Sequence, residues 1–144
     1  MMRKLIVLFM ASLLLSLPVR AEMMAMQPSI KLGIGDRPGV LFATIHNKGA
    51  ATRLISADSD AFARIELHTH QTEANGMMRM VQVEDFAVPA NGKLALKPGG
   101  HHLMLFGFQG EHGADVAVTL QFADGLAVRV STAPSQREKH HHGH

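Results

Sequence analysis

Short stretches in which hydrophobic and polar residues alternate follow one another along the chain from Pro28 onward. Residues two apart in a strand share a face, so this alternation is typical of strands that bury one face. Turn-forming words such as GDRPG, NKGA, EANG, PANG, PGG and ADG separate the stretches. The spacing favours an all-β fold, an antiparallel sandwich or barrel. The predicted strands lie at residues 29–34, 40–47, 52–58, 63–70, 77–83, 93–98, 101–108, 115–122 and 126–132.

Two segments fall outside the strand pattern. Residues 22–27 (EMMAMQ) are rich in methionine, and residues 135–144 (SQREKHHHGH) are polar and rich in histidine. We expect both to be flexible tails. The clustered methionines of the first segment could bind a soft metal ion, and a disordered remnant is an equal alternative.

The first 21 residues are predicted to be a cleaved signal peptide. Arg3 and Lys4 precede an apolar run, and small residues flank a cleavage position near Ala21. The run of about 14 apolar residues is shorter than the roughly 20 that span a bilayer. The chain has no cysteine, so neither a disulfide nor a lipid on cysteine is expected. We therefore expect a periplasmic protein with no stable membrane insertion after cleavage.

The predicted mature chain comprises a domain at residues 22–134 and the tail at residues 135–144. Without residues 1–21 it keeps 11 of the 14 basic residues against 12 acidic ones, a formal charge of −1 with neutral histidines. No basic surface remains that would indicate nucleic-acid binding. All ten histidines and seven of the ten methionines remain, and this is the first indication of a metal.

The strand alternation places several of these side chains on the face away from the core. In PGGHHLMLFGF, residues 98–108, Leu103 and Leu105 point inward, so His102 and Met104 point outward. The same rule turns His68 and Met80 outward in their own strands. If these strand ends meet, they gather four core ligands with three neighbours close by. The core set is His68, Met80, His102 and Met104, and the neighbours are His70, Met78 and His101.

The ligand types indicate which metal such a site would hold. Thioether sulfur is a soft, neutral donor that favours Cu(I), and imidazole accepts copper in either oxidation state. A site of two thioethers and two imidazoles suits a monovalent ion better than Zn(II) or a hard cation. It also lacks the thiolate of a blue-copper centre. Taken singly, a methionine is more often core filler than ligand.

The spacing of these four residues resembles the copper-binding signature of the periplasmic PCuAC-type copper chaperones. The words ARIELHTH, GMMRM, VPANGKLALKPGGHHLMLFG and VTLQF are also similar to that family, from about residue 28 to residue 132. Thr69 stands where many members have an accessory methionine. The resemblance implies a cupredoxin-like Greek-key sandwich that carries Cu(I) to copper-accepting proteins of respiratory oxidase assembly, for the copper centre of cytochrome c oxidase.

The tail offers a second candidate site, because four imidazoles within five residues bind Cu(II), Ni(II) or Zn(II) without a fold. We expect Cu(II) there, and a merely solvated end is the alternative. The tail ligands are His140, His141, His142 and His144.

Three other functions remain open. The chain could be a periplasmic metal buffer that uses the tail, a copper-dependent redox enzyme on a β-sandwich, or a structural sandwich with incidental histidines. No constellation of general acid, base and nucleophile is present, so we expect no enzymatic activity.

Overall fold

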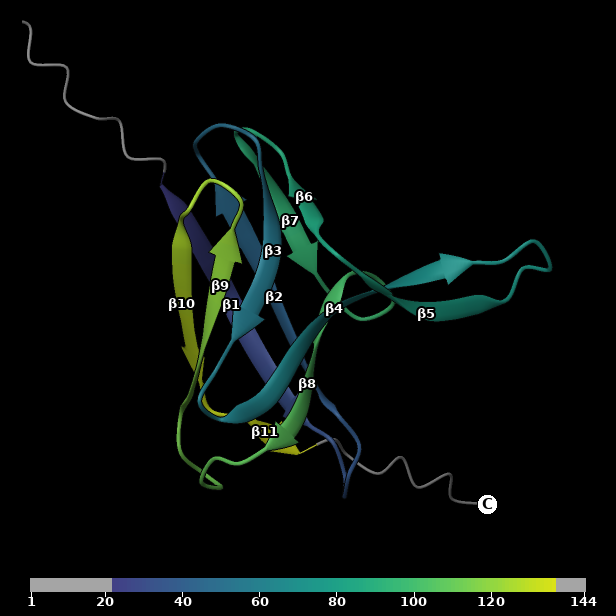
Figure 1. Cartoon of the computed structure of the whole chain (residues 1–144), viewed down its shortest axis with the longest axis vertical. Helices are drawn as coiled ribbons and strands as arrows, with labels where there is room; N and C mark the ends of the chain where they lie inside the picture. Colours follow the sequence, from purple (N-terminus) through teal and green to yellow (C-terminus); the bar gives the residue numbers. More distant parts are fainter. Residues whose placement is uncertain (1–21, 137–144) are drawn as a thin grey trace, which may run out of the picture.

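The computed structural model describes residues 22–136, which form two β-sheets packed face to face (Figure 1). The larger sheet has the order β11-β1-β2-β8-β4-β5, with β7 also paired to β2, and the smaller sheet has the order β10-β9-β3-β6. The strands are β1 (Met23–Leu32), β2 (Gly39–Asn47), β3 (Thr52–Asp58), β4 (Phe62–Thr72), β5 (Met78–Val83), β6 (Phe86–Val88), β7 (Gly92–Leu96), β8 (His102–Phe108), β9 (Val116–Phe122), β10 (Ala127–Thr132) and β11 (Ser135–Gln136).

The predicted all-β, cupredoxin-like sandwich is confirmed. Each of the nine predicted strands corresponds to a strand of the structure, and β3 has the predicted bounds. The short strands β6 and β11 were not predicted. Apart from the parallel pair of β1 and β11, the strand pairs are antiparallel.

The prediction of a flexible N-terminal tail is wrong, because β1 begins at Met23 and pairs with β2 along most of its length. The register shifts between Met26 and Ser29, and Gln27 has a φ of 52°. Such a bulge lets Pro28, which has no N–H, sit inside a strand. The proline that looked like a boundary in the sequence is therefore a bulge within one strand.

At the other end, the first two residues of the predicted tail form β11, which pairs with Lys31 and Leu32 of β1. The predicted signal peptide, residues 1–21, and the tail ligands at residues 140–144 lie outside the described residues. Within residues 22–136, the structure has no helix long and apolar enough to cross a membrane.

The core lies between the inner faces of the two sheets. Leu41, Leu103 and Leu105 of the larger sheet pack there against Leu54 and Leu120 of the smaller one, and all five are nearly inaccessible to solvent. Because neighbours in a strand alternate, the residues before and after Leu103 must leave this core. His102 and Met104 do so, yet both remain buried, at 4% and 7% exposure.

A turn at Pro98–Gly100 sets the position of His102. Strand β7 pairs with the second half of β2, and β8 pairs with the first half. The turn joins β7 to β8. The backbone N–H of Lys97 donates to the carbonyl of His101 at 2.8 Å, and Gly99 has a φ of 76°, which favours glycine. The chain thus re-enters the sheet with His102 as the first residue of β8.

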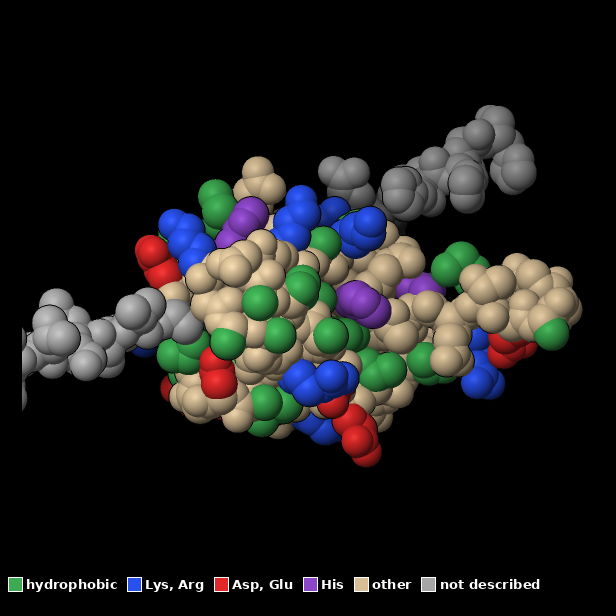
Figure 2. All heavy atoms as spheres, turned by 90° about the horizontal axis from the view of Figure 1, so that it is seen from above, with side chains coloured by type: hydrophobic (Ala, Val, Ile, Leu, Met, Phe, Trp, Pro, Cys, Tyr) green, Lys and Arg blue, Asp and Glu red, His purple; other side chains and the backbone are tan. Residues whose placement is uncertain are grey.

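Strands β4 and β5 continue beyond the rest of the larger sheet as a hairpin that projects from the sandwich (Figure 1). On the face seen in Figure 2, basic, acidic and apolar side chains are interspersed.

Candidate metal centre

The outer face of the larger sheet brings together residues from four strands, β2, β8, β4 and β5. In this register Val40, Met104 and Glu66 lie side by side across β2, β8 and β4. The next row contains His102 beside His68, and the row after that contains His70 beside Met80. Paired residues of antiparallel strands have Cβ atoms about 4.5–5.5 Å apart, so these rows are one continuous cluster.

His102 and Met80 make the closest contact between possible metal ligands. The Nδ1–H of His102 donates to the carbonyl of Gly100 at 2.9 Å, since a carbonyl oxygen only accepts. In the neutral imidazole, Nε2 then carries the lone pair, and it lies 3.1 Å from the sulfur of Met80. Two Lewis-basic atoms therefore converge, as they would on a shared soft cation.

A cavity of about 380 Å³ opens beside this contact. Its walls hold two imidazoles and two thioethers, those of His70, His102, Met80 and Met104. Arg37 and several apolar residues complete the lining, and the ring of Phe42 meets the ring of His102 edge-on, with centroids 6.4 Å apart. Such surroundings limit water access on the side of β8.

His68 lies next to His102, with ring centroids 6.0 Å apart, but it does not line the cavity. Its Nε2–H donates to a carboxylate oxygen of Glu66 at 2.8 Å, and its Nδ1 is buried without a hydrogen-bond partner in the structure. When a carboxylate accepts a hydrogen bond from one nitrogen of an imidazole, the other nitrogen keeps its lone pair and can bind a metal. His68 is therefore held in the tautomer that has its proton on Nε2 and its lone pair on Nδ1.

The carboxylate of Glu66 is itself held from two sides. Its other oxygen accepts a hydrogen bond from Nε of Arg64 at 2.7 Å. The hydrogen bonds from His68 and then Arg64 hold the pKa of Glu66 below its usual value of 4.5. Glu66 was not selected from the sequence, although it lies two residues before His68 and so shares its face.

The three predicted neighbours have different positions. His70 lines the cavity, with its ring centroid 5.4 Å from that of His102. Met78 is on the same face but lies further along the hairpin and is 58% exposed. His101 is directed away from the cavity, because its Nδ1 meets the hydroxyl of Thr69 at 2.9 Å and its ring packs on Phe86. The prediction that His101 lies close to the metal ligands is therefore wrong.

The donor set restricts the chemistry of the cluster. Among residues 22–136, no group of three or more histidine, aspartate or glutamate side chains is arranged to hold a metal. A metal site that uses the imidazoles on this face would therefore need further donors, and the thioethers of Met80 and Met104 lie in the same cavity wall. Two imidazoles that share one ion have ring centroids roughly 5–6.5 Å apart, given metal–nitrogen bonds of about 2 Å. Both His68 and His70 meet this condition relative to His102.

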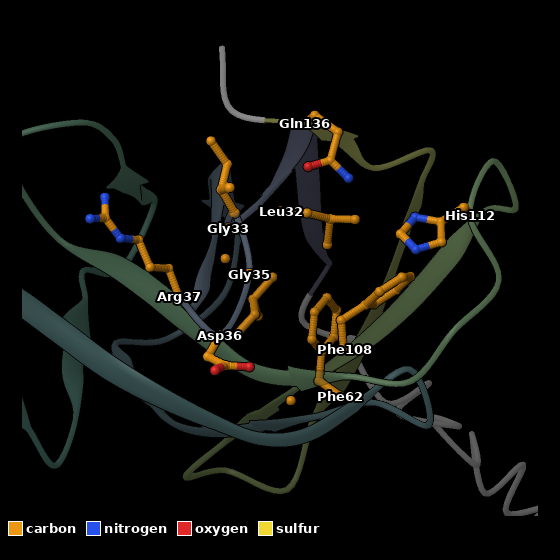
Figure 3. Close-up of a pocket in the computed structure, with 13 residues that line it drawn as sticks. Leu32, Gly33, Gly35, Asp36, Arg37, Phe62, Phe108, His112 and Gln136 are labelled. Carbon is orange, nitrogen blue, oxygen red and sulfur yellow. The ribbon is translucent and has the colours of Figure 1, made fainter. Parts of the chain in front are cut away.

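A second, larger cavity, of about 480 Å³, lies between the loop after β1 and the end of β8 (Figure 3). Leu32, Phe62 and Phe108 line it together with His112 and Gln136. His112 packs against Phe108, with ring centroids 5.4 Å apart. The lining contains one imidazole and no thioether, so none of the predicted metal ligands lies there.

Comparison with known proteins gives two matches in sequence. Residues 19–134 match the family described as LpqE-like, "Putative lipoprotein LpqE-like". The chain is also 37% identical over 97 residues to "Putative lipoprotein Lxx21020" of Leifsonia xyli subsp. xyli. That match covers 65% of this chain and 55% of the relative, so the chain spans about half the length of the relative.

Solved structures with the same fold include PCuAC domains. The copper-bound PCuAC domain of PmoF2 has a TM-score of 0.63 at 19% identity, and the match covers 79% of this chain and 92% of that one. The apo PCuAC domain of PmoF1 has a TM-score of 0.64 at 20% identity, over 79% and 93% of the two chains. The Cu(I) form of DR1885 from Deinococcus radiodurans has a TM-score of 0.57 at 23% identity, over 84% of each chain.

Proposed function

Because the chain belongs to the LpqE-like family, within the PCuAC group, we propose that it is an exported copper chaperone. It binds Cu(I) with His68, Met80, His102 and Met104 and hands the ion to a copper-accepting protein. We place it in the periplasm and its acceptors among the proteins of respiratory oxidase assembly. The copper-bound and Cu(I) forms of proteins with the same fold support this proposal.

The observation that carries the proposal is the contact between Nε2 of His102 and the sulfur of Met80, 3.1 Å apart at the wall of a cavity that Met104 also lines. Bonds of about 2.0 Å to nitrogen and about 2.3 Å to sulfur, at a tetrahedral angle, place two such ligands about 3.5 Å apart. For this pair of ligands, binding thus requires a shift of only a few tenths of an ångström. The set carries no charge, which suits a monovalent ion.

The buried Nδ1 of His68 favours this residue over His70 as the fourth ligand. Glu66 already fixes the His68 ring, and a metal would satisfy the buried nitrogen. His70 makes a longer contact, 3.4 Å from its Nδ1 to the carbonyl of Gly100. We assign His70 to the rim of the site, where it faces the cavity without completing the ligand set.

Uneven burial of the ligands supports a carrier rather than a storage role. His102 and Met104 belong to a buried strand, whereas Met80 is 45% exposed on the projecting hairpin. A partner can replace the exposed thioether first while the buried pair still holds the ion. Transfer then proceeds through intermediates that share ligands, and no catalytic group is needed.

The test is a Cu(I) titration of residues 22–144 against a competing Cu(I) chelator, with X-ray absorption to count the sulfur neighbours. We expect one tightly bound Cu(I) with about two sulfur ligands. The double variant M80A/M104A should lose more than about 100-fold in affinity, or about 2.7 kcal/mol. The matched control is M77A, because Met77 is exposed at the tip of the same hairpin.

A second comparison assigns the imidazole. H68N should weaken Cu(I) binding strongly, and H70N should bind as the wild type does. The reverse result would make His70 the ligand and His68 a structural residue. Tight Cu(I) binding that survives M80A/M104A would contradict the proposed site altogether.

A further inference from the structure

We propose that Met24, Met26 and His46 form a second site for a monovalent soft metal ion, separate from the first. Met24 of β1 lies directly opposite His46 of β2. Two residues further along the same strand pair, Met26 lies opposite Thr44. Met24 and Met26 are 45% and 46% exposed, and His46 is exposed. The strand pairing therefore adds an imidazole to the methionine-rich segment.

The alternation of β1 places both thioethers on one side. Met23 and Ala25 pack against the core. Met24 and Met26 therefore project from the opposite face of the sheet, where His46 also lies. Directly paired residues have Cβ atoms about 4.5–5.5 Å apart, and diagonal pairs are within reach of long side chains. All three donors can therefore reach one ion without any movement of the backbone.

Nearby charges select a monovalent ion. Lys93 of β7 pairs with His46 from the other side, and an ammonium group near the site would repel a dication about twice as strongly as a monocation. The carboxylate of Glu22, the residue before β1, lies 3.6 Å from Nζ of Lys48, so this nearby negative charge is paired with a lysine. Two neutral thioethers and one imidazole beside a lysine suit Cu(I) or Ag(I) and disfavour Zn(II).

This second site is independent of the first, although both lie on the outer face of the larger sheet. His46 is four residues from Phe42 along β2, about 13 Å at about 3.3 Å per residue, and Phe42 contacts His102. One ion cannot bridge both sites at this separation. The exposed site would bind more weakly than the buried one, because it has three solvent-accessible ligands. It would raise the capacity of the domain to two soft monovalent ions.

The test uses residues 22–144 with ¹³C-labelled methionine methyl groups and ¹⁵N-labelled histidine. Ag(I), which has no redox chemistry under these conditions, is added while each methyl and imidazole signal is followed by NMR. We expect the signals of Met24, Met26 and His46 to shift together. M24L should abolish the shifts of the other two, whereas M23L is the matched control, because Met23 faces the core.

Two results would overturn the proposal. Unchanged Met24 and Met26 signals when Ag(I) is in excess over the first site and the tail would exclude a site there. Shifts of these methyl groups that persist in H46Q would show thioether binding without the imidazole. The signals of Met80 and Met104 report separately on the first site, so failure of one site is distinguishable from failure of the other.

Discussion

Replacing Glu66 by glutamine tests whether this carboxylate orients His68 for copper. Glu66 accepts from Nε2 of His68 at 2.8 Å and from Nε of Arg64 at 2.7 Å, and its side chain is only 18% exposed. Glutamine has one acceptor oxygen in place of two, so it cannot keep both contacts in their present geometry. Loss of such an outer partner typically weakens metal binding by about 10- to 100-fold, or about 1.4–2.7 kcal/mol.

We expect E66Q near the lower end of this range, since its amide oxygen can still accept from His68, and E66A near the upper end. The assay is anaerobic competition for Cu(I) with a chelator at about pH 7, where the lowered pKa keeps Glu66 ionised. The matched control is D85N, which also removes one charge from an arginine ion pair, that of Asp85 with Arg53. Equal affinities of E66Q, E66A and D85N would refute the orienting role of Glu66.

Two further predictions concern stability. The side chain of Asn47 is buried, donates hydrogen bonds to the carbonyls of Ala50 and Pro89, and accepts one from the N–H of Gly49. N47A removes all three hydrogen bonds and should therefore lower the unfolding free energy by about 2–4 kcal/mol. Urea denaturation measures this loss, and a change below about 0.5 kcal/mol would contradict it. The hydrogen bond from Arg53 lowers the pKa of Asp85 from 3.8. The stabilisation by this ion pair is therefore complete above about pH 3.8 and is lost as pH falls through the lower pKa of the folded state. Urea midpoints measured between roughly pH 2 and pH 6 should therefore fall less steeply at the acid end in D85N than in the wild type. An unchanged acid dependence in D85N would contradict the assignment.

The strand pattern could be predicted because alternation records which face each residue occupies. It worked well where β-branched and leucine residues occupy every second position, as in β9, in which every second residue is buried. It failed at β1, because methionine carries little strand preference and Pro28 resembled a boundary. A bulge at Gln27 accommodates that proline, and a bulge has no reliable signature in the sequence. The strand β6 has only three residues, too few to show a period.

The outward direction of the candidate ligands could also be predicted, but their neighbours could not. Alternation assigns His68, His70 and Glu66 to one face without saying which strands lie beside them. Only the register shows that His68 is opposite His102, whereas His70 is opposite Met80. The pairing of Met24 with His46 is hidden from the sequence for the same reason, since the two residues belong to different strands.

The fold and the proposed site depend on the same strand, and this determines what each substitution can report. In β8, Leu103 and Leu105 anchor the core while His102 and Met104 leave from the opposite face. A core substitution in β8 would therefore displace the proposed ligands as well as cost about 2–5 kcal/mol. Met80 belongs to the projecting hairpin and is absent from the core cluster, so its replacement changes the ligand set alone. Loss of Cu(I) binding in a Met80 variant with unchanged unfolding free energy would thus separate the chemistry of the site from the stability of the fold.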